Sequence, residues 1–140
     1  MESKYLKQFK KLSASGKGPI LHGDRLIVEV LPKDELKKGG IIIAADLKDH
    51  RSMTQENRAQ LCMILMTGAG YEDEDGETQE LPYKPGEIIL VSDLSLKPYT
   101  QFPGLVDFTP NDIALSRTTE IHMSWDSIEH YEEYKAALNS

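Results

Sequence analysis

The sequence predicts a mainly β protein, a small barrel that carries short helices at its ends. Two observations lead to this prediction. Short stretches of strand-favouring residues recur between residues 25 and 116. Turn-forming residues such as Gly, Pro, Asn and Asp separate them, and this spacing is typical of small barrels. The length of 140 residues suits one domain with modest extensions.

Composition excludes several classes of protein. Hydrophobic residues make up 39% of the chain and charged residues 28%, so it can bury a core and stay in solution. The net charge of -7 argues against a nucleic-acid partner, because binding to phosphates needs a basic face. The single cysteine, Cys62, excludes an intrachain disulfide and a multi-cysteine zinc site. No apolar run reaches transmembrane length and no secretory segment follows the N-terminus, so we expect no membrane partner.

Residues 1–12 predict an amphipathic helix, because Tyr5, Phe9 and Leu12 are spaced at i, i+4 and i+7 among lysines. The Ser- and Gly-rich residues 13–19 then break it. Such a helix packs on the domain or frays in solvent. A mitochondrial presequence is a third reading, against which Glu2 and the lack of arginine count. We assign residues 1–18 to an N-terminal amphipathic extension and linker.

The predicted barrel domain covers residues 19–118. In its first strand Leu26, Val28 and Val30 point one way and the residues between them the other, and the strand ends before Pro32. The second strand is a continuous apolar run. The predicted strands are Arg25–Leu31, Gln60–Met66, Glu87–Ser92, Leu105–Phe108 and Ile113–Ser116.

Residues 119–140 are predicted to be a C-terminal helical extension. The helix is expected over Ser124–Leu138, with Asp126 and Glu129 as a weak capping signal near its start. It either packs an aromatic face on the barrel or binds a partner. That face would contain Trp125, Ile128, Tyr131, Tyr134 and Leu138.

The segment between residues 32 and 59 is long for a connection inside a compact domain. In its middle stand Gly39, Gly40, Ile41, Ile42 and Ile43. Three adjacent isoleucines with polar flanks predict an exposed apolar patch, which often marks a binding site. The other interpretation is one more buried strand of the barrel. The two glycines and the polar flanks favour a mobile loop.

An acidic stretch predicts a solvated hairpin, with Asp75-Gly76 as its turn. A calcium loop does not fit. When Gly76 is placed at the loop glycine, Tyr71 falls at the first ligand and Pro82 at the last. The residues of the hairpin are Glu72, Asp73, Glu74, Asp75, Gly76 and Glu77.

No catalytic constellation is found, so we predict no enzyme, no cofactor and no metal. The chain lacks the complete dinucleotide fingerprint, the phosphate-binding loop motif and the G-x-S-x-G motif. Cys62 lies in an apolar run and is expected in the core. The histidines show no metal-ligand spacing; they are His22, His50, His122 and His130.

Five separated pieces, in the right order, resemble the GroES co-chaperonin (chaperonin-10) family. They are residues 20–28 (the opening strand), 38–43 (the mobile-loop motif), 61–70 (the next strand and its glycine ending), 84–90 and 111–115. Together they cover roughly residues 19 to 117. The terminal helices lie outside the family module, residues 44–59 are long, and residues 93–104 lack the usual Gly-Tyr-Gly pattern. These departures indicate a divergent or phage-type member.

The resemblance implies a GroES-like barrel that forms a homo-oligomeric ring, a heptamer. It implies a co-chaperonin that caps an ATP-driven, GroEL-type chaperonin in its nucleotide-bound state and assists protein folding. The contact would be the mobile loop from Gly39 to Ile43. The compartment would be the bacterial cytoplasm, or the host cytoplasm for a phage protein.

In the family, the loops that correspond to the acidic hairpin meet near the ring axis as a roof. Six acidic side chains between Glu72 and Glu80 would crowd there, which predicts a loose roof or a ring that assembles more readily at higher salt. The alternative function is a GroES-fold binding or assembly module that caps no chaperonin. A barrel enzyme that uses His22, Asp24 or Asp112 is the third class.

Overall fold

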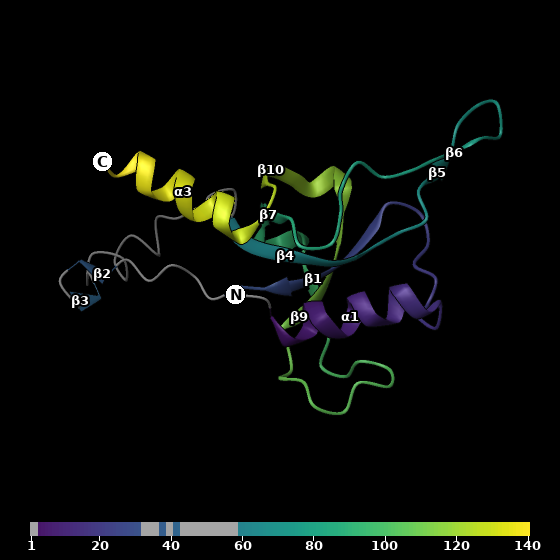
Figure 1. The fold of residues 1–140 in the computed structure, drawn as a ribbon, viewed down its shortest axis with the longest axis horizontal. Helices are drawn as coiled ribbons and strands as arrows, with labels where there is room; N and C mark the ends of the chain where they lie inside the picture. Colours follow the sequence, from purple (N-terminus) through teal and green to yellow (C-terminus); the bar gives the residue numbers. More distant parts are fainter. Residues whose placement is uncertain (1–2, 32–36, 39–40, 43–58) are drawn as a thin grey trace.

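The computed structural model describes residues 3–31, 37–38, 41–42 and 59–140. The body is a six-stranded antiparallel sheet in the order β10-β7-β4-β1-β9-β8 (Figure 1). Its strands are β1 (Arg25–Val30), β4 (Ala59–Thr67), β7 (Ile88–Ser92), β8 (Lys97–Pro98), β9 (Ile113–Arg117) and β10 (Ile121–Trp125). This architecture confirms the mainly β prediction and four of the five predicted strands, to within a residue or two at their ends.

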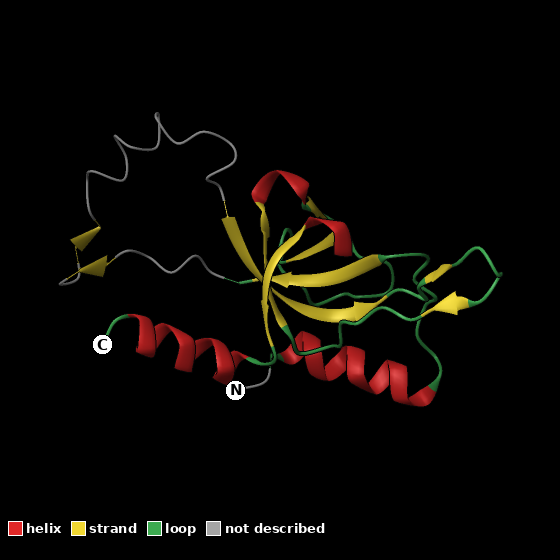
Figure 2. Cartoon of the chain, turned by 90° about the horizontal axis from the view of Figure 1, so that it is seen from above, coloured by secondary structure: helices red, strands yellow, loops and turns green. Residues whose placement is uncertain are grey.

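One face of the sheet encloses the inner core. Its members come from alternate positions of neighbouring strands, as the period of two requires. Leu96, just before β8, and Ile121 in β10 both pack on this core, although they lie at opposite edges of the sheet. The sheet therefore curves toward a barrel, as Figure 2 shows. The buried residues of the inner core are Leu26, Val28, Cys62, Ile64, Ile89, Val91, Leu96 and Ala114.

Helix α1 (Lys4–Ser15) covers the opposite face of the sheet. Ser3 caps its start by accepting a hydrogen bond from the Leu6 N–H at 2.9 Å. The helix ends at Gly16, whose φ of 71° lies in the left-handed region that glycine favours. Tyr5, Leu6 and Phe9 are buried against the outer core, so α1 is packed rather than frayed. The helix extends three residues beyond the predicted end at Leu12.

The prediction of a strand over Leu105–Phe108 is wrong. Only a single bridge, between Phe102 and Leu105, forms in this region. The rings of residues 99–108 instead pack edge to face: Phe102 lies 5.7 Å from Phe9 and 5.1 Å from Tyr99, between ring centroids. Burying these aromatic rings under α1 stabilises the fold more than a short strand ladder beside Pro103 would.

The second helix was also predicted to begin too early. Residues 121–125 form β10, which pairs with β7, and α3 (Ile128–Leu138) begins only after Ser127. The Ser127 hydroxyl accepts a hydrogen bond from the His130 N–H at 3.1 Å and caps the helix, so the capping role predicted for Asp126 is wrong. No helix in the described part of the chain is both long and apolar enough to cross a membrane.

Candidate partner-binding site

The isoleucine segment forms a sheet of its own. Strand β2 (Lys37–Lys38) pairs antiparallel with β3 (Ile41–Ile42), with Lys37 opposite Ile42 and Lys38 opposite Ile41. This two-stranded sheet is separate from the six-stranded one. The alternative in which Ile41 and Ile42 add a strand to the barrel is therefore wrong. Gly39, Gly40 and Ile43 of the predicted site lie outside the described residues.

The acidic segment forms a hairpin, as predicted. Strands β5 (Tyr71–Glu72) and β6 (Thr78–Gln79) pair with Tyr71 opposite Gln79 and Glu72 opposite Thr78. Asp73 organises the turn between them, because one carboxylate oxygen accepts from the Asp75 N–H at 2.9 Å and the Glu77 N–H at 3.0 Å. The other oxygen accepts from the Gln79 side-chain amide at 2.6 Å. We call residues 70–80 the acidic arm.

The electrostatics of the acidic arm centre on Asp73. The Gln79 amide, followed by the backbone N–H groups of Glu77 and Asp75, lowers the pKa of the Asp73 carboxyl below its usual value. Hydrogen bonds to the charged form stabilise it, so Asp73 stays ionised at neutral pH. The carboxylates of Glu72, Glu74 and Asp75 are exposed. The acidic arm is therefore an ordered, solvated concentration of negative charge.

The acidic arm projects from the body of the molecule. In both views it lies at the opposite end from the β2–β3 pair, so the two predicted sites are not brought together (Figures 1 and 2). At its base, Gly70 has a φ of 96°, and a Cβ at this position would collide with the Gln79 carbonyl oxygen. Only glycine fits this close approach of the two strands.

Two of the residues considered for chemistry, Cys62 and Asp24, lie in structural positions. Cys62 is fully buried in the inner core, which confirms that it is a core residue. Burial, with a smaller contribution from Asp93, raises the pKa of its thiol to about 12. Asp24 forms an ion pair with Arg117 at 3.1 Å. Among the described residues no three His, Cys, Asp or Glu side chains gather into a possible metal site.

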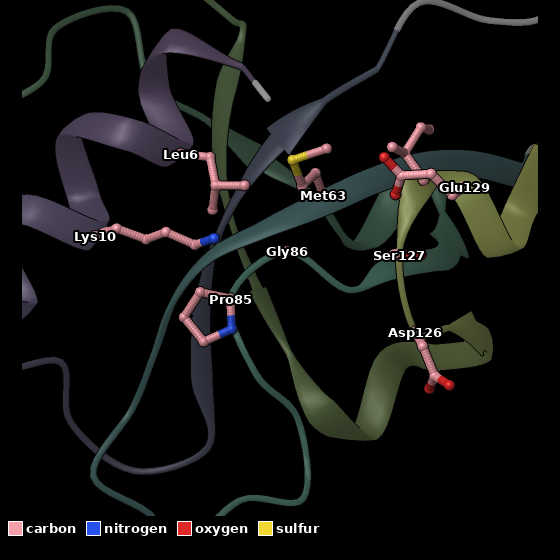
Figure 3. Close-up of a pocket in the computed structure, with 9 residues that line it drawn as sticks. Leu6, Lys10, Met63, Pro85, Gly86, Asp126, Ser127 and Glu129 are labelled. Atoms are coloured by element: carbon pink, nitrogen blue, oxygen red, sulfur yellow. The ribbon is translucent and has the colours of Figure 1, made fainter. Parts of the chain in front are cut away.

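A cavity of about 250 Å³ lies where α3 begins. In Figure 3, Leu6 and Lys10 approach it from α1, Pro85 and Gly86 from the turn before β7, and residues 126–129 from the start of α3. Acidic and basic side chains share its rim, so it presents no single charge to a ligand. We interpret it as the junction at which α3 leaves the body.

Sequence reasoning missed two positioning residues. Asp73 was predicted only as one more acidic charge. An Asp side chain can accept a hydrogen bond from the backbone N–H two residues further on, so an Asp at this place before a turn is a signal that the sequence does contain. Tyr5 was predicted only on the apolar side of a helix that packs or frays, but its hydroxyl also accepts a hydrogen bond from the Thr109 N–H at 3.0 Å. No local signal in the sequence predicts a contact across 104 residues.

Known proteins with similar sequences support the resemblance inferred from the motifs. The co-chaperonin GroES of Methylacidiphilum infernorum (isolate V4) is 30% identical over 70 residues, which are 50% of this chain and 63% of that protein. The co-chaperonin GroES of Leuconostoc citreum (strain KM20) is 35% identical over 68 residues, which are 49% of this chain and 64% of that protein. The chain thus spans a little under two thirds of the length of these curated relatives. No family model matches it.

The sequence similarity and the fold point in the same direction. The similarity covers half of the chain at modest identity, and the structure adds a curved antiparallel sheet with short helices. Over about half of its length, the chain is therefore similar to co-chaperonins named GroES.

Proposed function

We propose that this protein is a co-chaperonin subunit that caps a GroEL-type chaperonin ring in its nucleotide-bound state and so assists protein folding. In this proposal it assembles into a homo-oligomeric ring, a heptamer, in a bacterial cytoplasm. The observation that carries the proposal is the separation of Ile41 and Ile42 from the barrel, in a chain related to co-chaperonins. The segment from Gly39 to Ile43 would make the contact.

The energies of the contact suit a reversible cap. Burying one isoleucine side chain yields about 1.5 to 3 kcal/mol, so Ile41, Ile42 and Ile43 together yield about 5 to 9 kcal/mol. Ordering each residue of a segment costs about 1 to 2 kcal/mol, which offsets most of that gain over five residues. One subunit therefore binds weakly, while a ring of subunits binds tightly through avidity. Weak single contacts also let the ring leave when the partner changes conformation.

The test combines size-exclusion chromatography and light scattering, on the protein alone and mixed with a bacterial chaperonin. We expect a ring-sized assembly that co-elutes with the chaperonin only when nucleotide is present. The variant Ile41→Ser, Ile42→Ser, Ile43→Ser should keep the assembly and lose the co-elution, because it removes the apolar contact alone.

A matched control carries three comparable changes elsewhere: Ile20→Ser, Leu94→Ser and Val106→Ser. These side chains are exposed and lie outside residues 37–43, so co-elution should persist. Loss of co-elution in the control as well would point to a general effect of lost apolar surface. A wild-type protein that never co-elutes would overturn the capping proposal and favour a GroES-fold module with another partner.

A further inference from the structure

Another cavity, of about 310 Å³, lies beside the end of β9. The two short 3-10 helices that follow β7 and β9 border it, η2 (Asp93–Ser95) and η3 (Thr118–Glu120). Three basic side chains also line it: Arg25 of β1, Lys97 of β8 and Arg117 of β9. A water molecule takes up about 30 Å³ in the liquid, so the cavity has room for a small ion together with several waters.

The register of the sheet places the three cations on one side of it. Arg25 stands directly opposite Arg117, and Lys97 stands opposite Leu115, two residues before Arg117. Residues that are directly opposite share a face of the sheet, and so do residues two apart in one strand. Like charges directly opposite one another destabilise a ladder. This end of the sheet therefore holds an unfavourable concentration of positive charge.

The charges of Arg25 and Lys97 are not neutralised within the described part of the chain. Arg117 has a partner, because its Nη2 atom lies 3.1 Å from Oδ1 of Asp24. Arg25 donates a hydrogen bond to the His22 carbonyl oxygen at 3.3 Å, but a carbonyl carries no net charge. Neither Arg25 nor Lys97 forms an ion pair with a described residue. An anion in the cavity would supply the missing negative charge through charge-assisted hydrogen bonds.

A carboxylate in the same cavity decides which anion fits. Glu120 lines the cavity, is partly buried and forms no ion pair with any described residue. Its carboxylate repels an anion unless the anion brings a proton that the carboxylate can accept. Inorganic phosphate keeps at least one P–OH group at neutral pH, whereas sulfate has no proton to donate. A phosphate monoester has lost most of its last proton at neutral pH, because its second pKa is about 6.

We propose that this cavity is a binding site for inorganic phosphate. Arg25, Lys97 and Arg117 hold the charged oxygen atoms, and the planar donors of the two guanidinium groups match the geometry of phosphate. Glu120 accepts the hydrogen bond from the P–OH group. Sulfate has a similar shape but leaves the Glu120 carboxylate facing an anion without a proton, so the site prefers phosphate. The bound ion also relieves the repulsion between the two opposite arginines.

Equilibrium dialysis with radiolabelled phosphate tests the site. The buffer is neutral, and sodium chloride keeps its ionic strength constant, so that general salt effects cancel. We expect saturable binding of one phosphate per chain. Unlabelled phosphate should displace the label better than equal concentrations of sulfate or of a simple phosphate monoester. The absence of saturable binding would overturn the proposal, and so would displacement by sulfate that equals displacement by phosphate.

Three single variants locate the site. Arg25→Gln and Lys97→Gln each remove one cation and should weaken phosphate binding by about tenfold or more. Lys84→Gln changes the net charge equally, at an exposed lysine outside the cavity, and should bind phosphate as the wild type does. Far-UV circular dichroism checks the fold, which Arg25→Gln should keep because it removes one of two opposed like charges. Equal binding by all three variants would overturn the assignment.

Glu120→Gln tests the selectivity through a gain of binding, which a misfolded protein cannot imitate. The neutral amide no longer repels an unprotonated anion and can donate to one, so sulfate should now displace labelled phosphate as well as phosphate does. A variant that keeps the wild-type preference would overturn the role of Glu120. The dialysis needs neither a ring nor a chaperonin, so its result is independent of the capping proposal.

Discussion

Cys62 shows how burial decides the chemistry of a single residue. Its side chain is fully buried in β4, and the pKa of its thiol rises from 9.0 to about 12. A shift of this size lowers the thiolate fraction at pH 8 by about a thousandfold, and the thiolate is the reactive form.

We therefore predict that Cys62 in the folded protein barely reacts with a disulfide reagent such as Ellman's reagent. In guanidinium chloride the same thiol should react within minutes. The absorbance at 412 nm measures both rates, and a rapid reaction of the folded protein would show that β4 opens readily.

Trp125 marks the limit of sequence reasoning at the residue scale. It falls at helical spacing with Ile128 and Tyr131, so the pattern predicts one helix through all three. In the structure Trp125 pairs with Ile88 in the sheet, and its ring still packs on Tyr131. The free edge of β7 offers backbone hydrogen bonds that no local pattern reveals. Cys62, whose surroundings in the sequence are apolar on both sides, was predicted correctly because the signal was local.

At the scale of elements, the acidic arm depends on two glycines for different reasons. Gly70 and Gly76 have φ values of 96° and 79°, which strain other residues. A Cβ on Gly76 meets nothing within 4 Å, whereas one on Gly70 would collide with the Gln79 carbonyl. At position 76 glycine is required only for its backbone conformation. At position 70 the lack of a Cβ is required as well, because the Gln79 carbonyl occupies that space.

We predict that Gly76→Ala costs only the strain of a left-handed residue, about 1 to 2 kcal/mol within the arm. Gly70→Ala should cost more, because the base of the arm must also separate. Amide hydrogen exchange at Asp75 and Glu77, whose N–H groups bond to Asp73, measures the local stability of the arm in each variant. Equal protection in the two variants would contradict the importance of the close approach.

The elements that were predicted well share a feature. β1, β4 and β9 are buried strands, and their apolar runs are long enough to identify them without knowing their partners. The stretch over Leu105–Phe108 was misread because Leu105 and Phe108 pack on the outer core, with the Phe108 ring edge-on to Phe102, while Val106 is exposed, so no ladder forms. The acidic arm was readable because Asp75-Gly76 is a local turn signal. The docking of α1 depends on distant residues, so the sequence left it open between packed and frayed.

At the scale of the whole molecule, the acidic arm acts on the proposed ring through repulsion between copies. Salt would relieve repulsion among acidic arms that meet near the axis. Wild-type assembly is therefore expected to strengthen as the salt concentration rises.

Neutralising the arm tests whether this repulsion acts in the assembly. The variant Glu72→Gln, Glu74→Gln, Glu77→Gln keeps Asp73 and so keeps the turn. We predict tighter assembly than wild type at low salt, and a difference that fades as salt rises. Light scattering across a salt series measures both. Identical curves would show that the arms do not approach one another in the assembly.

The hydrogen bond between the Tyr5 hydroxyl and the Thr109 N–H has a consequence for synthesis on the ribosome. Its two partners are separated by 104 residues, and α1 also packs on β4, far along the chain. At about 5 to 20 residues per second, α1 is synthesised roughly 5 to 20 seconds before residue 109. During that time the apolar side of a lysine-rich helix has no native surface to cover it. We expect the charged lysines of this helix, which are exposed in the folded protein, to keep the nascent segment hydrated until the sheet is complete.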